Sequence, residues 1–295
     1  MERISKILLC GGTHGNEMTG IRLVQQWMQD PAPIQRPGLD VHLLLANPEA
    51  IELCRRYVGF DLNRAFTANL LDPKTPALYS DVERAREINR DFGPKGSEHA
   101  CDLAIDLHNS TANMGITLIL NRLDPALRRI SAIIATEYPL VHILFQPEDV
   151  DQLPYLPSLA KRDITVEVGP QAHGTLRASL FSQTRAVVLR LLDLIVAWNE
   201  ETISLTPIPV PVFTQIASVD YPRNADGDVS AMIHPEREGR DFEPVYPGDP
   251  LFQSFAGERI PWQGPHALWP CFLGEAAYLE KHIALTQMTL SVENW

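Results

Sequence analysis

The sequence predicts an α/β fold with a largely parallel or mixed sheet, followed by a smaller all-β domain. Short apolar runs typical of strands alternate with helix-like amphipathic stretches through the first two thirds of the chain. Beyond Glu201 the helical period disappears, and short β-type runs are separated by turn sequences such as Pro247-Gly248-Asp249. With 295 residues, 45% of them hydrophobic, the chain is long enough for two domains. We place them at residues 1–205 and 206–295.

Each element of the first domain follows from a local pattern. The uninterrupted apolar run 41–46 is typical of a buried parallel strand. Pro31 and Pro33 end the first helix, for which Thr13 or Asn16 is the expected N-cap. The expected strands are 4–10, 41–46, 103–107, 116–120, 140–145 and 164–168. The expected helices extend from that N-cap to residue 29 and over 48–53, 81–92, 124–137 and 176–198.

The second domain begins with a proline-rich segment. The sequence TPIPVPVF, residues 206–213, is extended in character and predicts a linker. The rest of the chain lacks helical periodicity, so we expect a small all-β domain over residues 212–295.

Composition and charge exclude several classes of function. The formal net charge is −12, with 37 acidic against 25 basic residues, which argues against nucleic acid or an anionic membrane as a partner. The four cysteines form no C-x-x-C pair, and so long a chain needs no disulfide framework. The apolar run before Gly11 is too short for a signal peptide, and no run approaches the roughly 20 apolar residues of a transmembrane helix. We therefore predict a cytoplasmic protein.

A His and a Glu stand three apart after the first strand, in the sequence GGTHGNEMTG. On one helical turn, His14 and Glu17 would project to the same side, and both residue types are good zinc ligands. The stretch by itself also fits a phosphate-binding loop or an ordinary strand–turn–helix. It lacks the G-x-G-x-x-G fingerprint of dinucleotide-binding loops, and the chain has neither a P-loop nor a G-x-S-x-G elbow.

Further polar side chains occur at the ends of other predicted strands. His108 follows one strand, and Glu167 lies in another between two valines, so that its carboxylate points away from them. In open α/β sheets ligands bind outside the carboxyl ends of the strands. His14, Glu17 and His108 would leave one position of a tetrahedral zinc site open, the pattern of carboxypeptidase-type hydrolases. Glu167 is then a candidate general base, and Asp106 could orient His108.

Basic residues gather in one segment of this acidic chain. Arg55, Arg56 and Arg64 lie close together in sequence, and guanidinium groups bind carboxylates bidentately. For Arg55 we expect an ion pair with a nearby acid such as Asp61. For Arg64, which follows Asn63, we expect a clamp for a substrate carboxylate.

With these residues in view, the chain resembles the aspartoacylase family, which consists of zinc deacylases built on a carboxypeptidase-like domain. The matching stretches run nearly end to end: GGTHGNEMTG, LLANP, RRYVGFDLNRAF, ERAREIN, DLHNSTANMG, VEVGPQAHGTLRA, VDYPR, YPGDP and EAAYLEK. The resemblance implies one zinc ion per subunit, bound by His14, Glu17 and His108, with Glu167 activating the zinc-bound water.

The resemblance also implies roles that the residue pattern leaves open. Arg56 would polarise the scissile carbonyl, and Asn63 and Arg64 would hold the carboxylate of the amino acid. Tyr278 would close over the substrate from the second domain, which would restrict entry to small N-acyl amino acids. A homodimer is implied by the resemblance alone.

Two positions depart from the pattern of aspartate-specific members of the family. Pro157 precedes the sequence SLAK where those members have an arginine, and His282 stands where they have a second basic residue. Lys161 and Arg162 are the nearby substitutes. The default substrate is N-acetyl-L-aspartate, hydrolysed to acetate and L-aspartate, and N-acetyl aromatic or neutral amino acids are the main alternative. A desuccinylase of succinyl amino acids and a zinc-binding protein without catalysis are less favoured.

Overall fold

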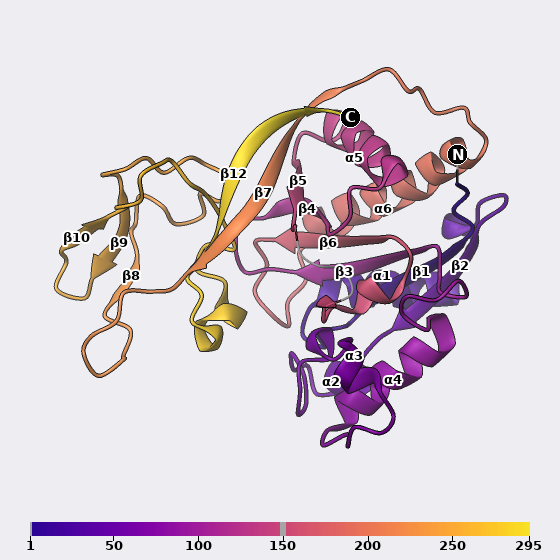
Figure 1. Ribbon diagram of the computed structural model, residues 1–295, viewed down its shortest axis with the longest axis horizontal. Helices are drawn as coiled ribbons and strands as arrows, with labels where there is room; N and C mark the ends of the chain where they lie inside the picture. The colour runs from indigo at the N-terminus through magenta and orange to yellow at the C-terminus, as the bar shows by residue number, and fades with distance from the viewer. Residues whose placement is uncertain (1, 148–151) are drawn as a thin grey trace.

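The computed structural model describes residues 2–147 and 152–295, and a mixed nine-stranded sheet runs through it (Figure 1). The strand order is β11-β12-β7-β5-β4-β6-β3-β1-β2. The strands are β1 (Lys6–Gly11), β2 (Asp40–Leu45), β3 (Leu103–Asn109), β4 (Gly115–Leu120), β5 (Val141–Phe145), β6 (Asp163–Gly169), β7 (Pro209–Val219), β11 (Trp269–Cys271) and β12 (Leu285–Asn294). The predicted α/β fold with a mixed sheet is confirmed.

Helices cover both faces of this sheet, with α5 and α6 above it and α2, α3 and α4 below it in Figure 1. One face packs on apolar side chains of α1, α5 and α6, and the other packs on α4 and two short 3-10 helices, η2 and η4. The helices are α1 (Met18–Gln29), α2 (Pro48–Glu52), α3 (Ala68–Leu71), α4 (Ser80–Phe92), α5 (Pro125–Glu137), α6 (Ala178–Asn199), η2 (Leu62–Arg64) and η4 (Leu156–Leu159). Among the described residues, no helix combines the length and apolar character needed to cross a membrane.

The order of the central strands decides where polar side chains meet. Strands β1, β3 and β6 are parallel neighbours, so their carboxyl ends lie at one edge of the sheet. His108 on β3 is in register with Glu167 on β6, which places the two side chains next to each other on one face. The next strand, β4, runs antiparallel to β6, and β5 is parallel to β4.

Several local expectations need correction. Glu17 occupies the N-cap position of α1 without a side-chain cap, so Thr13 and Asn16 do not cap this helix. Strand β3 continues through His108 and Asn109, which therefore belong to the strand instead of following it. Strand β2 is parallel as predicted but partly exposed, because it lies at the edge and pairs with β1 alone.

The proline-rich segment is largely a strand and not a linker. Strand β7 begins at Pro209 and pairs with β12 along its whole length. On its other side β7 pairs with β5 only at Phe213 and Thr214, so Pro209 and Pro211 lie where no second neighbour needs their missing N–H groups. The expected boundary between residues 205 and 206 falls in the connection between α6 and β7.

The C-terminal region both extends the large sheet and forms a smaller one. Strands β7, β12 and β11 complete one side of the nine-stranded sheet. The remaining strands, on the left in Figure 1, form a three-stranded antiparallel sheet of β8 (Ala231–Ile233), β9 (Pro250–Ser254) and β10 (Arg259–Pro261). Between these strands and β12 lies a 3-10 helix, η5 (Ala276–Lys281), which carries Tyr278.

Candidate metal centre and active site

The turn between β1 and α1 brings His14 and Glu17 to the edge of the sheet. Gly12 has a φ of +73°, a backbone conformation that glycine adopts without strain. A Cβ atom on Gly15 would lie 2.1 Å from the backbone of Ala50 in α2, so only glycine fits there. His14 and Glu17 therefore meet through this turn and the helix N-cap, and not as two residues of one helical turn.

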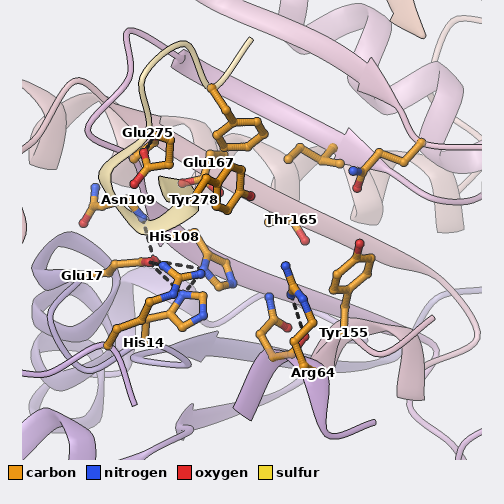
Figure 2. A pocket seen from close by; sticks show the side chains of 16 residues that line it. His14, Glu17, Arg64, His108, Asn109, Tyr155, Thr165, Glu167, Glu275 and Tyr278 are labelled. Atoms are coloured by element: carbon orange, nitrogen blue, oxygen red, sulfur yellow. Dashed lines mark hydrogen bonds and ion pairs between the residues drawn. The ribbon is translucent and has the colours of Figure 1, made fainter. Parts of the chain in front are cut away.

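His14, Glu17 and His108 form a buried group, which we call the His–Glu–His cluster (Figure 2). His14 Nδ1 lies 2.7 Å from Glu17 Oε1, and His108 Nδ1 lies 2.9 Å from Glu17 Oε2. The two Nδ1 atoms are 3.2 Å apart. All three residues thus direct a potential ligand atom to one small volume.

A second ring of side chains holds the cluster from outside. His14 Nε2 lies 3.0 Å from Asp61 Oδ1, and His108 Nε2 lies 2.8 Å from Asp106 Oδ2. Asp106 also accepts a hydrogen bond of 2.8 Å from Thr13 Oγ1. A carboxylate on Nε2 fixes the tautomer that leaves Nδ1 free to bind a metal. The predicted orienting role of Asp106 agrees with this geometry.

The charges of the cluster also suit a cation. Burial opposes ionisation of Glu17, but His14 and His108 outweigh it and hold the pKa of this carboxyl well below its usual range. Burial would lower the pKa of His108, but Asp106 and Glu17 raise it well above its usual range, so the surroundings of this ring favour a positive charge, which a bound cation can supply in place of the proton. Two imidazoles and a carboxylate with anchored outer atoms are a donor set typical of zinc, so the residues fit this ion.

Glu167 lies beside the cluster and is turned into the same cavity (Figure 2). Among the described residues, its carboxylate has no hydrogen-bond partner. Burial raises its pKa well above the usual range, and although His108 opposes this shift, the charges of Glu17 and Glu275 add to it. The raised pKa makes this carboxylate a stronger base than an exposed glutamate.

Arg55 and Arg56 occupy different environments, and only one of them reaches the site. Arg56 donates a hydrogen bond of 3.1 Å to Glu17 Oε1, and its Nε lies 3.7 Å from Asp61. Arg55 is exposed and forms no ion pair within the described residues, so the predicted pairing of Arg55 with Asp61 is wrong. Asp61 is bound instead by its neighbours in space, since Lys281 Nζ also lies 3.1 Å from it.

Asn63 and Arg64 both line the cavity, as the clamp hypothesis requires. Asn63 Oδ1 accepts a hydrogen bond of 2.9 Å from the Leu156 backbone. Arg64 donates to the Asn63 carbonyl at 2.8 Å, and its guanidinium carbon lies 4.9 Å from the centre of the Tyr155 ring. It forms no ion pair among the described residues, which leaves its charge available to an anionic ligand.

Tyr278 reaches the cavity from η5 in the C-terminal region. Its ring centre is 5.2 Å from that of Phe272. Burial raises the pKa of its hydroxyl, so the group stays protonated at neutral pH. Glu275 fixes the start of η5, because it accepts hydrogen bonds from the hydroxyl of Ser110 and from the backbone and hydroxyl of Thr111 at 2.8 and 3.0 Å. The loop after β3 therefore holds Tyr278 in place through Glu275.

The cavity has a second side, which we call the neutral wall and which consists of Ile119, Gln146, Tyr155 and Thr165. In Figure 2, Tyr155 and Thr165 lie on the side away from the His–Glu–His cluster. The whole cavity measures about 590 Å³ including its open mouth. The lining residues with a permanent positive charge are Arg56 and Arg64 among those described.

The basic residues that could bind a side-chain carboxylate of the substrate do not line the cavity. Lys161 pairs with Asp102 at 3.0 Å. Arg162 pairs with Asp124 at 2.9 Å and with Glu2. His282 is 65% exposed in its side chain and lies 3.5 Å from Asp220. Pro157 is buried in η4 and does not line the cavity.

Sequence reasoning missed several residues of the site. Asp61 was expected to pair with Arg55, and its contact with His14 was not predicted. Thr165 could have been found, because two-residue spacing puts it on the same strand face as Glu167. Gln146 and Glu275 gave no local signal, since they reach the site through contacts between distant segments.

Together, fold and site define a class of protein: a mixed α/β sheet with a candidate metal centre where parallel strands end. Residues 3–195 match the family model described as "Succinylglutamate desuccinylase/Aspartoacylase catalytic domain". Residues 209–289 match the one described as "AstE/AspA barrel-sandwich hybrid domain". The chain belongs to the succinylglutamate desuccinylase/aspartoacylase family.

Named relatives align over nearly the whole chain. Mouse aspartoacylase is 43% identical over 99% of this chain and 96% of its own length. The human N-acyl-aromatic-L-amino acid amidohydrolase (carboxylate-forming) is 38% identical over 97% of this chain and 91% of its own length. The crystal structure of murine aminoacylase 3 superposes with a TM-score of 0.94 at 37% identity, covering 100% of this chain and 98% of that one.

Proposed function

We propose that this protein is a zinc-dependent amidohydrolase that cleaves the amide bond of small N-acyl-L-amino acids. The main support for this proposal is the position of Glu167. Its side chain lines the same cavity as the His–Glu–His cluster and Arg64. A base, a metal-binding group and a carboxylate-binding cation around one cavity suit hydrolysis of an amide next to a carboxylate. The relatives reported above are named as acylases or as an amidohydrolase of N-acyl amino acids, which supports the same reaction.

His14, Glu17 and His108 would bind zinc, with one ion in each subunit. A bound zinc ion supplies Lewis acidity to a water molecule and to the substrate carbonyl. Glu167 accepts a proton from the attacking water and delivers it to the departing amine. Arg56 stabilises negative charge on the carbonyl oxygen, and the protonated hydroxyl of Tyr278 donates a hydrogen bond across the cavity. Asn63 and Arg64 hold the carboxylate of the amino acid.

The side chain of the amino acid would face the neutral wall. N-acetyl-L-aspartate is the substrate suggested by the relatives named aspartoacylase. The wall favours uncharged side chains, because Lys161, Arg162 and His282 pair with acids outside the cavity. Residues 148–151, outside the described part, have the sequence EDVD and add no basic group. We therefore infer that N-acetyl amino acids with aromatic or other neutral side chains are better substrates than N-acetylaspartate.

Metal analysis and a substrate panel test this function. We expect purified protein to contain one zinc per chain, to lose activity when a chelator removes the metal, and to regain it with added zinc. N-acetyl-L-aspartate, N-acetyl-L-tyrosine and N-succinyl-L-glutamate would be compared by the release of free amine. Absence of amine release from all three by the zinc-loaded protein would overturn the proposal.

Three further properties remain proposals. The units 1–205 and 206–295 would act as a catalytic domain and a capping domain, with Tyr278 as the link between them. A cytoplasmic location agrees with the free cysteines at positions 10, 54, 101 and 271, since thiols stay reduced there. A homodimer would be tested by light scattering of the zinc-loaded protein.

A further inference from the structure

The floor of the cavity crosses four strands of the sheet in a fixed order. His108 lies on β3, Thr165 and Glu167 lie on β6, and Ile119 lies on β4 in register with Thr165. Gln146 directly follows β5, the next strand, and its backbone N–H binds the carbonyl of Leu120 at 2.9 Å. Neighbouring strands are about 4.8 Å apart, so Gln146 lies roughly 10 Å from β6 on the side away from the cluster.

The side-chain amide of Gln146 is oriented by the C-terminal region. Its Nε2 donates a hydrogen bond of 2.7 Å to Oε1 of Gln215 on β7. Among the described residues, Oε1 of Gln146 has no hydrogen-bond partner. Gln215 accepts one N–H of this amide, and although the nitrogen keeps a second N–H, the oxygen Oε1 of Gln146 can accept a hydrogen bond from a ligand.

We propose that Gln146 determines substrate specificity by accepting a hydrogen bond from a donor at the far end of the substrate side chain. This inference rests on the proposed amide hydrolysis and on Arg64 as the clamp for the amino-acid carboxylate. The ligand class is an N-acyl amino acid whose long, neutral side chain ends in a hydroxyl, an indole N–H or an amide.

The chemistry of the neutral wall excludes the other end groups. A carboxylate would meet the acceptor oxygen of Gln146 without a cation beside it, and burying an unpaired charge is costly. A short polar side chain would end near Ile119 and Thr165 and would not reach Gln146. A long apolar side chain would reach Gln146 and leave its oxygen buried without a donor, which also costs free energy.

N-acetyl-L-tyrosine and N-acetyl-L-phenylalanine form a matched pair of test substrates, because they differ only by one hydroxyl. We expect the zinc-loaded wild type to prefer the tyrosine substrate by roughly three- to tenfold in kcat/KM. Gln146→Leu removes the acceptor and shortens the side chain by one atom, so this ratio falls to about one while the phenylalanine substrate is still cleaved. Gln215→Leu lowers the ratio in part, because the amide of Gln146 loses its orientation.

Gln253→Leu is the matched control, since Gln253 lies on β9 and does not line the cavity, and it keeps the wild-type ratio. An unchanged tyrosine-to-phenylalanine ratio in Gln146→Leu overturns the role of Gln146 and leaves the amidohydrolase proposal standing. A wild type that prefers N-acetyl-L-aspartate to both does the same. A wild type that releases no amine from any N-acyl amino acid overturns the proposed function itself, and this inference with it.

Discussion

The His–Glu–His cluster and the neutral wall share one cavity but differ in how their polar groups are satisfied. In the cluster, Asp61 and Asp106 hold the Nε2 atoms of both imidazoles, and Glu17 has Arg56 on one oxygen and the Asn109 backbone N–H on the other. In the wall, the hydroxyl of Thr165 has no hydrogen-bond partner among the described residues, and Gln146 has one on its N–H side only.

This difference suggests that one side of the cavity positions the reacting atoms and the other side distinguishes between substrates. A group of buried charges with anchored outer atoms has one stable geometry, which suits the positioning of reacting atoms. A wall with free polar atoms can change residue by residue without disturbing those charges. We therefore expect changes at the cluster to affect every substrate alike, and changes at the wall to alter the ranking of substrates.

The largest effect is expected at Glu167, where the two sides meet. Glu167→Gln keeps the shape of the side chain and removes the base, so kcat falls by about 10²–10⁴-fold for every substrate. Metal content stays at the wild-type value, because Glu167 is not among the three residues of the cluster. Steady-state kinetics and metal analysis measure the two effects, with Glu52→Gln on the exposed side of α2 as the control. Near-normal turnover would remove Glu167 from the mechanism.

The second largest effect is expected at the carboxylates that hold the two histidines from outside, Asp61 and Asp106. Asp106→Asn weakens the bond that holds His108 Nε2, and we expect zinc affinity to fall by roughly 10–100-fold. Competition with a chromophoric chelator measures this affinity, and exposed Asp228→Asn serves as the control. If affinity is unchanged, the cluster holds its geometry without this ring, and the contrast with the wall disappears.

Arg64 tests the border between the cluster and the wall. Arg64→Lys keeps the positive charge but loses the planar fork that binds a carboxylate bidentately. We expect KM to rise by about tenfold for all N-acyl amino acids, with a smaller change in kcat. The amide substrate that lacks the carboxylate, N-acetyl-L-tyrosinamide, should be cleaved equally slowly by wild type and variant. If the wild type cleaves N-acetyl-L-tyrosine and N-acetyl-L-tyrosinamide equally well, Arg64 is not the clamp for the carboxylate.

The smallest effect is expected within the wall. Thr165→Val preserves shape and removes a hydroxyl that no described residue binds, so we expect the free energy of unfolding to change by less than about 0.5 kcal/mol. The ratio of kcat/KM between two substrates should shift by a few fold, while zinc affinity stays the same. Denaturant titration and a two-substrate assay measure these effects. A loss of metal would mean that wall and cluster are coupled.

Much of the fold could be predicted because its signals are local. Apolar runs and helical periods located β1, β3, β4, β5 and β6 and all the long helices to within a few residues. The strand that was taken for a linker shows the limit, since Pro209 and Pro211 are tolerated only because β5 does not reach them. That fact depends on the relative positions of strands and not on the sequence near the prolines.

The sequence by itself determined the chemical content of the cavity: two histidines, two glutamates and an arginine at predicted strand ends or in a basic segment. Residue type indicated His14, Glu17 and Arg64, and period-two alternation placed the side chain of Glu167 on one face of its strand. Only the tertiary structure decided which carboxylates anchor His14 and His108, and that Lys161, Arg162 and His282 leave the cavity. It alone brought Gln146 and Gln215 together, because the order and register of strands are set by long-range packing.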